Sequence, residues 1–296
     1  MKKNIFMVLA VALTTAAVLT SCSNDDDSVS SVPSVSSMSI TFALDGDWQL
    51  SDESFTASRR RRAAAVSGSS MTDVWVLDYM GGTLRQTVHQ ASCDDGFGAP
   101  TLSLAYGSHT LYFVTSAGES PTLNTNAHTL SFGAVRDTFW KSVAVNVTSG
   151  TSANQAVTLD RIVAKVAIQP TDEVPASINT ITIAPATWYL TFDYLTGNPT
   201  TATSDYSRTL TIPDSYKGTT GTLKVNLLGL CGADFTTNVA VTAKDADNNT
   251  IGYAAISNAP MKRNRASRFS GTLFGNQNGL TMNINDEWLT DYEGNW

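Results

Sequence analysis

Side chains that could ligate a metal or act as nucleophiles are few in this chain. It contains three cysteines and three histidines among 296 residues. His89 and Cys93 lie close together in a turn-rich segment, but no second Cys/His pair completes a zinc site. His109 is expected to begin a strand and His128 to lie in a loop, and neither has a catalytic motif around it. We therefore expect no catalytic residue, metal site or cofactor, and no enzymatic activity.

Other chemistry is disfavoured as well. The glycine-rich stretches lack the sequence contexts of nucleotide-binding loops. The adjacent carboxylates Asp286 and Glu287 would point to opposite faces of a strand and could not act together. A net charge of −7 gives nucleic-acid binding no electrostatic support. Cys231 is expected to be a buried thiol or an occasional partner of Cys93, and the sequence leaves that choice open.

Two groups of residues instead predict covalent processing. The first is Cys22, which ends the stretch Leu19-Thr20-Ser21-Cys22 after Lys2, Lys3 and an apolar run. That run is shorter than the ~20 residues of a membrane-spanning helix, so residues 1–22 predict a secretory signal peptide. Its end resembles a lipobox, in which the cysteine is acylated and anchors the precursor in the outer membrane. The alternative is an ordinary signal peptide with an incidental cysteine.

Residues 23–38 are expected to form a disordered tether, because they are polar and have no hydrophobic period. Asp25, Asp26 and Asp27 follow the lipobox closely and resemble the surface-export signal of lipoproteins in Bacteroidetes-type bacteria. A solvated tether is the plainer alternative, and the two interpretations are compatible.

The second group is Arg59, Arg60, Arg61 and Arg62, which are four of the nineteen basic residues. Adjacent like charges favour an exposed, extended loop in which a protease can bind the backbone. An arginine-specific protease cutting after Arg62 would leave Ala63 as the new N-terminus, although the sequence does not decide which arginine is used. The alternative is a solvated basic loop that touches anionic lipid headgroups.

The elements that must position these residues are strands. Apolar and polar residues alternate over short segments separated by Gly, Asn, Asp and Pro clusters, and the composition is low in charge. Only residues 118–130 could hold a short helical turn. We predict an all-β fold, with strands that include residues 39–44, 74–77, 111–114, 143–147, 162–168, 178–183, 223–228, 239–243, 269–274 and 280–284.

About a dozen short strands exceed one sandwich and fit two. The polar segment 148–155 is the expected connector, which places the boundary near residue 157. The predicted domains are a prosegment with the arginine loop at 39–62, an N-terminal sandwich at 63–156 and a C-terminal sandwich at 157–296.

Cutting after Arg62 would release one strand together with the lipid anchor. Ile40, Phe42 and Leu44 alternate with Ser39, Thr41 and Ala43, the period of a half-buried strand. Without that strand the fold would expose an apolar groove with unpaired backbone edges, which is a template for a strand of another chain. Because such a head-to-tail contact does not close, repeating it builds a filament.

The order of these parts resembles the fimbrillins of Bacteroidales, the type V pilins. Segments 39–44, 62–63 and 72–79 are similar to the family's prosegment strand, its cut site and its first mature strand. Residues 161–166 resemble its mid-chain strand containing an arginine, and residues 262–265 with 269–274 resemble its penultimate segment. Residues 286–296, with Trp288 and Trp296, resemble its closing strand.

The resemblance implies two tandem transthyretin-like, Greek-key β-sandwiches. It also implies that a neighbour's C-terminal strand replaces the removed one. Leu280, Met282 and Ile284 alternate with polar residues and would form that donor strand, with Trp288 and Trp296 as anchors. The alternative is that this segment is only the last strand of the second sandwich.

Two classes of function follow from this. The first is a polymerising fimbrial subunit at the cell surface that contributes to adhesion, with other fimbrial subunits and an arginine-specific protease as partners. The second is an uncleaved, lipid-retained anchor or accessory subunit, or a glycan-binding surface lipoprotein. Exposed aromatic residues would serve the glycan-binding role, and the candidates are Trp140, Trp188, Tyr189 and Tyr194.

Overall fold

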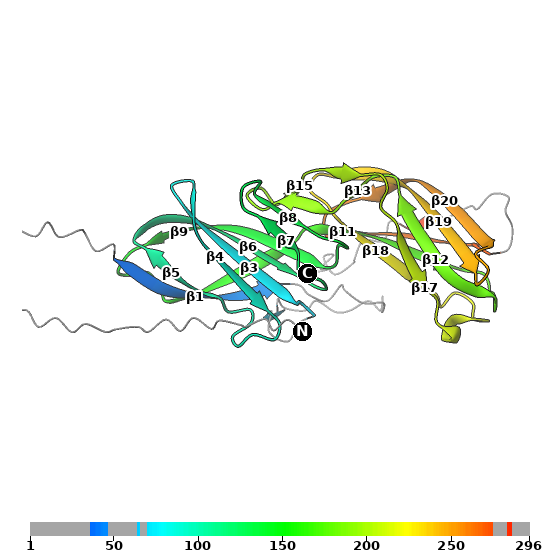
Figure 1. The fold of residues 1–296 in the computed structure, drawn as a ribbon, viewed down its shortest axis with the longest axis horizontal. Coiled ribbons are helices and arrows are strands. Elements are labelled where there is room, and N and C mark those ends of the chain that lie inside the picture. The colour runs from blue at the N-terminus through cyan, green and yellow to red at the C-terminus, as the bar shows by residue number, and fades with distance from the viewer. Residues whose placement is uncertain (1–35, 47–63, 66–69, 275–282, 286–296) are drawn as a thin grey trace, which may run out of the picture. The chain divides into compact units, whose positions relative to one another are not determined.

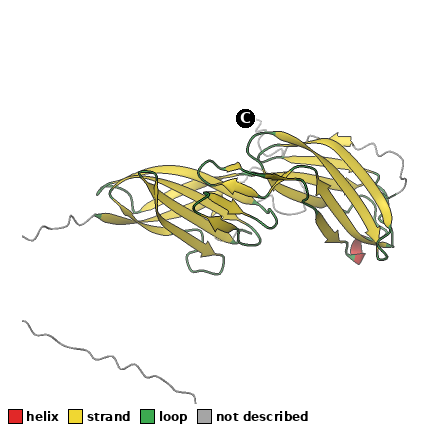
Figure 2. Cartoon of the chain, turned by 45° about the horizontal axis from the view of Figure 1, so that its top comes forward, coloured by secondary structure: helices red, strands yellow, loops and turns green. Residues whose placement is uncertain are grey.

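Strands account for almost all regular structure in the computed structural model, which describes residues 36–46, 64–65, 70–274 and 283–285. Within those ranges the only helical element is the short 3-10 turn Asp214–Tyr216 (Figure 2). The prediction of an all-β fold is therefore confirmed. None of the helical structure in the described ranges is long and apolar enough to cross a membrane.

Eight strands form the first sheet (Figure 1). Their order is β2-β1-β10-β9-β6-β3-β4, and β5 also pairs with β1. Most neighbours are antiparallel, but β1 and β10 run parallel. The bounds are β1 Ser37–Gly46, β2 Ala64–Ala65, β3 Asp73–Met80, β4 Thr83–Ala91, β5 Thr101–Ala105, β6 Gly107–Ser116, β9 Thr138–Val147 and β10 Asn154–Arg161.

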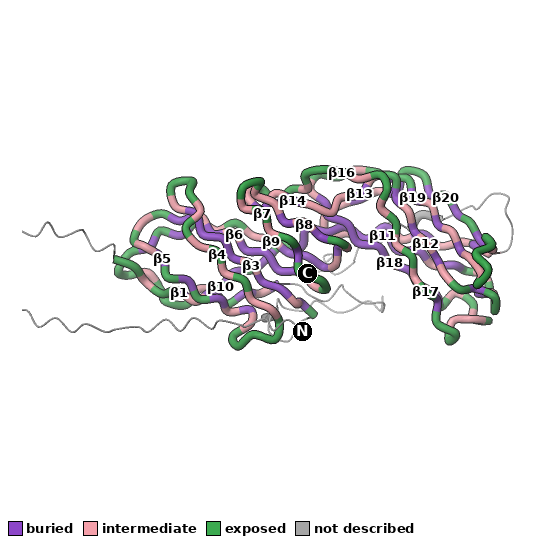
Figure 3. Tube along the Cα trace, in the orientation of Figure 1, coloured by how far each residue is buried: buried purple, intermediate pink, exposed green. Residues whose placement is uncertain are grey.

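Apolar side chains that alternate along these strands meet in one core. Ile40 and Phe42 of β1, Leu102 of β5 and Phe113 of β6 are each at most 1% exposed. The period-2 alternation of the strands places this set on one side of the sheet, and on β3 the opposite side is apolar as well, with Leu77 and Tyr79 in a separate cluster. Figure 3 shows the buried residues of β3, β6 and β1 in purple.

Two four-stranded sheets pack over a second core. Their orders are β18-β11-β21-β22 and β17-β12-β19-β20. Their facing residues include Val166 of β11, Ile181 of β12 and Val241 of β19, all fully buried. The bounds are β11 Val163–Pro170, β12 Ile178–Pro185, β17 Arg208–Thr211, β18 Val225–Leu230, β19 Phe235–Asp245, β20 Thr250–Met261, β21 Ala266–Gly271 and β22 Asn283–Asn285.

Short strands connect these two parts. β7 (Thr122–Asn124), β8 (Thr129–Ser131), β14 (Thr191–Asp193) and β15 (Asn198–Pro199) form a small sheet in which β8 pairs with β14. β13 (Trp188–Tyr189) pairs with β16 (Ala202–Thr203). Residues 118–130, the one segment that the sequence allowed a short helical turn, form the hairpin of β7 and β8 instead.

The chain passes from the first sheet to the second part at Ile162, between β10 and β11. Segment 148–153, within the expected connector, joins β9 to β10 of the same sheet. The predicted boundary near residue 157 falls within β10, and the division into two domains at that point stays a prediction.

Candidate strand-exchange site

β1 is an internal strand with a neighbour on each side. Residues Thr41 to Gly46 run parallel to β10, from the pair Thr41–Asn154 to the pair Gly46–Leu159. Its first half, Ser37 to Thr41, is antiparallel to β5. The predicted prosegment strand is therefore built into the sheet, and it is not an appendage at its edge.

Backbone hydrogen bonds join β1 to both flanks. The N–H of Thr41 donates to the carbonyl of Ala153 at 2.8 Å, on the β10 side. The N–H of Phe42 donates to Pro100 O and that of Leu44 to Gly98 O, each at 3.0 Å, on the β5 side. Because the donors alternate between the flanks, loss of β1 would open two backbone edges at once.

Side chains of β1 fill the first core from one end to the other. Ile40 and Phe42 are 0% exposed and Leu44 is 1% exposed. The Phe42 ring packs against Phe113, with centroids 5.2 Å apart. Burying three such side chains contributes roughly 1.5–3 kcal/mol each. An incoming strand would have to present similar side chains at these three alternate positions.

One short stretch of chain connects β1 to the rest of the described fold. It runs from Gly46 to β2, whose Ala64 and Ala65 pair back onto Gly46 and Asp45. The predicted processing residues Arg59, Arg60, Arg61, Arg62 and Ala63 lie in that stretch, outside the described residues, as does Cys22. A cut there would leave β1 held only by its hydrogen bonds and packing.

Of the predicted donor strand, the structure describes only the backbone of β22. Ile284 pairs with Phe269 of β21, so β22 is an edge strand of the second part and lies in a different sheet from β1. Leu280, Met282, Trp288 and Trp296 lie outside the described residues. Upstream, the Asp172 carboxylate accepts hydrogen bonds from the backbone N–H groups of Leu273 and Phe274, at 3.0 and 2.6 Å, and holds the chain where this segment begins.

Two of the histidines pair with aspartates, and the two described cysteines form no disulfide. His89 Nε2 lies 2.8 Å from Asp73 Oδ1, and the buried His109 lies 2.6 Å from Asp78 Oδ1. Cys93 is exposed and Cys231 is buried, and each is a free thiol. The described residues contain no cluster of three or more His, Cys, Asp or Glu side chains that could hold a metal ion.

The aromatic residues considered for glycan binding are mostly internal. Trp188 and Tyr194 are 0% exposed, and Trp140 and Tyr189 are half-buried. Trp140 Nε1 donates to the carbonyl of Tyr194 at 2.7 Å, and the Tyr79 and Tyr194 hydroxyls are 2.9 Å apart. Burial is the main cause that raises the pKa of Tyr194 well above its usual range. These side chains pack the interior and do not form an exposed sugar-binding platform.

Sequence reasoning missed a buried ion pair at the end of β10. Arg161 Nε and Nη2 lie 2.6 and 2.9 Å from the carboxylate oxygens of Asp137. Arg161 also donates to Asn264 Oδ1 at 3.0 Å and lies 4.5 Å from the Phe139 ring centroid. A single arginine beside an apolar strand was the available signal, but its partners are distant in sequence.

Comparisons with known proteins agree with this fold. Residues 107–296 match the model of a family of unknown function (DUF6562). A Bacteroides ovatus protein described as a "putative adhesin" is 13% identical, with a TM-score of 0.50 over 84% of this chain and 93% of that one. A Bacteroides ovatus "putative cell adhesion protein" is 11% identical, with a TM-score of 0.50 over 86% and 98%.

The fimbrial anchor protein Mfa2 from Porphyromonas gingivalis is 8% identical, with a TM-score of 0.48 over 86% of this chain and 99% of that one. No curated protein sequence matches this chain. At identities of 11–13%, the two Bacteroides ovatus structures establish a shared β-sandwich fold and nothing finer. That agreement confirms the β-sandwich fold that the resemblance to the Bacteroidales fimbrillins implies.

Proposed function

The chain belongs to DUF6562, a family of unknown function, and we propose that it is a structural subunit of a cell-surface fimbria that contributes to adhesion. In this proposal it is made as a lipoprotein acylated at Cys22, cut after Arg62 and polymerised by strand exchange. Its role is assembly and not catalysis. Support comes from the shared fold with two Bacteroides ovatus proteins described as adhesion proteins.

The observation that carries the proposal is the combination found at β1. A strand with one fully buried face, paired on both edges, is linked to the rest of the described fold only through the stretch that contains four adjacent arginines. A permanent strand gains nothing from a neighbouring run of protease target residues, since one cut would convert it into a separable peptide. A strand that must be replaced needs such a cleavage site.

Cleavage alone would leave β1 in place, because its hydrogen bonds and buried side chains do not depend on the covalent link. Departure of β1 exposes two backbone edges and an apolar groove, so a donor strand must arrive as β1 leaves. Leu280, Met282 and Ile284 have the required spacing of alternate apolar residues, and we assign the donor role to this segment of a neighbouring subunit. Trp288 and Trp296 would then anchor the contact.

The test compares the precursor with a variant in which Arg59, Arg60, Arg61 and Arg62 are changed to alanine. Limited digestion with an arginine-specific protease should produce a chain beginning at Ala63 and, on unboiled gels, a ladder of oligomers. The four-alanine variant should give neither product, whereas the control Arg85→Ala, in exposed β4, should behave like the native chain.

N-terminal sequencing of the protein from the cell surface gives the second result. A start at Ala63 is expected. A full-length chain that is still acylated at Cys22 would overturn the fimbrial-subunit proposal, and ladders that persist in the four-alanine variant would overturn the role of the arginines.

A further inference from the structure

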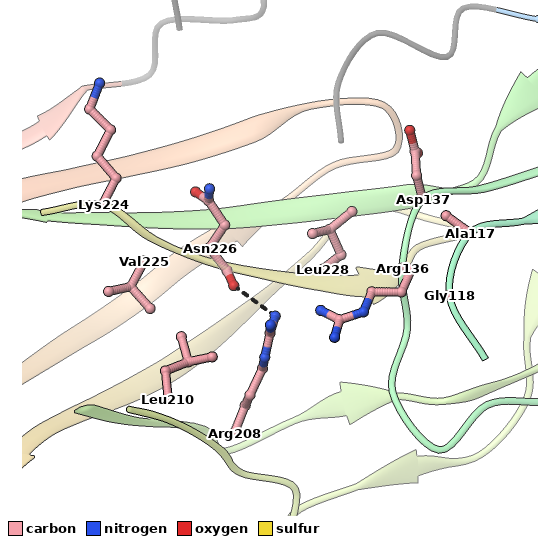
Figure 4. Close-up of a pocket in the computed structure, with 10 residues that line it drawn as sticks. All are labelled: Ala117, Gly118, Arg136, Asp137, Arg208, Leu210, Lys224, Val225, Asn226 and Leu228. Atoms are coloured by element: carbon pink, nitrogen blue, oxygen red, sulfur yellow. Dashed lines mark hydrogen bonds between the residues drawn. The ribbon is translucent and has the colours of Figure 1, made fainter. Parts of the chain in front are cut away.

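A pocket of about 270 Å³ lies apart from the groove of β1 (Figure 4). One side is formed by the loop that contains Arg136, immediately before β9. The other side is formed by Arg208 and Leu210 of β17 and by Val225 and Leu228 of β18. The pocket thus combines two arginines with an apolar wall, and the residues of its two sides are distant in sequence.

The guanidinium groups of Arg136 and Arg208 both point into this pocket (Figure 4). Among the residues that the structure describes, neither forms an ion pair with a carboxylate. Asp137 lies beside them, but its two oxygens accept hydrogen bonds from Arg161. The ammonium group of Lys224 points away from the two guanidinium groups in Figure 4. The pocket therefore holds positive charge without a matching anion.

This arrangement is electrostatically unfavourable for Arg208. Burial, followed by the charge of Arg136, lowers the pKa of Arg208 from its ordinary value. The Arg208 guanidinium group thus loses solvation while it is repelled by Arg136, and an anion placed between the two side chains would offset both effects. Charged groups that are perturbed in this way within a cleft mark candidate binding sites.

Gly118 and the backbone carbonyl of Asn226 position the side chains of Arg136 and Arg208. Gly118 has a φ of 85°, and a Cβ atom there would lie 2.7 Å from Arg136 Cγ, so the glycine leaves room for the arginine side chain. Arg208 Nη1 donates to the backbone carbonyl of Asn226 at 3.2 Å. That bond uses one nitrogen of Arg208 and leaves other N–H groups of its guanidinium available to a ligand.

We propose that this pocket binds a small organic carboxylate, whose charged group lies between Arg136 and Arg208. Guanidinium groups match the planar, two-oxygen geometry of a carboxylate. The side chains of Leu210, Val225 and Leu228 would contact the apolar body of the ligand. The volume of about 270 Å³ is slightly below the roughly 300–1,000 Å³ of sites for drug-sized molecules, which fits one ring and not a polymer.

Isothermal titration of the full chain with four probes tests the ligand class. Phenylacetate carries both features, phenylacetamide has the same body without charge, acetate has the charge without the body, and inorganic phosphate is a plain anion. Phenylacetate should bind at least tenfold more tightly than each of the other three. Equal binding of phenylacetamide, acetate or phosphate, or no binding of phenylacetate, would overturn the proposal.

Variants test the two arginines. Arg136→Gln and Arg208→Gln should each weaken phenylacetate binding at least tenfold, whereas Arg85→Gln on exposed β4 should leave it unchanged. Because Arg136→Gln removes the charge that repels Arg208, it should not lower the melting temperature of the unliganded protein. Unchanged affinity in both variants, or a lowered melting temperature in Arg136→Gln, would show that the arginines are structural.

Discussion

Arg161 and Asp137 form an ion pair whose side chains are only 4% and 0% exposed. Two nitrogen–oxygen contacts, the amide oxygen of Asn264 and the ring of Phe139 surround the guanidinium group. A buried pair of this kind is not a large net source of stability, since desolvation offsets the attraction. Loss of one partner is costly, however, because the other charge then stays buried without this ion pair.

Arg161→Met should therefore destabilise the protein by about 3–5 kcal/mol, since it leaves the Asp137 carboxylate without its charge partner. Urea unfolding at pH 7 measures this change. The control is Lys141→Ala, which breaks the ion pair with Asp160, whose side chains are 40% and 62% exposed. That exposed pair should contribute less than about 1 kcal/mol. Equal destabilisation by the two substitutions would contradict the prediction.

The two described cysteines should differ sharply in reactivity. Burial, with a smaller effect of Asp234, raises the pKa of the Cys231 thiol to about 11. A raised pKa keeps the thiol protonated below that value, so at pH 8 only about 0.1% of Cys231 would be thiolate. In the Cys22→Ser protein, a disulfide reagent at pH 8 should modify Cys93 and not Cys231.

Cys93→Ser should remove the fast phase of that reaction, and the slow phase should accelerate as the pH is raised toward 11. A fast phase that persists in Cys93→Ser would show that Cys231 is accessible as a thiolate.

At the scale of the element, β1 shows what sequence could predict. Its alternation is local and predicts one buried face formed by Ile40, Phe42 and Leu44, which the structure confirms. The parallel pairing with β10 depends on residues more than a hundred positions away, and no local pattern encodes it. The pairing of β8 with β14 and the shared pocket of Arg136 and Arg208 also join residues distant in sequence, so no local pattern predicts them.

Phe42→Ala tests the packing of β1. The substitution removes a fully buried ring that contacts Phe113, so it should destabilise the intact chain by about 3–5 kcal/mol. In protein cut after Arg62 it should also speed the exchange of β1 for an isotope-labelled peptide of residues 37–46, followed by mass spectrometry. Ser39→Ala, on the exposed face, should change neither quantity. An exchange rate unaffected by Phe42→Ala would mean that β1 is not held by this core.

At the scale of the whole described fold, a third cluster joins the first sheet to the second part. Leu77 and Tyr79 of β3 meet Phe192 and Tyr194 there, and the tyrosine hydroxyls lie 2.9 Å apart. The pairing of β8 with β14 adds backbone hydrogen bonds to this contact. Because the two parts share buried residues, neither can unfold without exposing a face of the other, and we expect a single unfolding transition.

Gly197 is the position at which this coupling can be weakened by one substitution. Its φ is 69°, and a Cβ atom there would lie 2.7 Å from the Trp140 ring, whose indole N–H donates to Tyr194 O. Gly197→Ala should displace that ring, lower the melting temperature and separate the transition seen by tryptophan fluorescence from that seen by circular dichroism. Gly82→Ala is the matched control, because φ is 77° but no atom lies within 4 Å, so it tests backbone strain without the clash. If Gly197→Ala and Gly82→Ala lower the melting temperature equally, the contact between Trp140 and Gly197 does not couple the two parts.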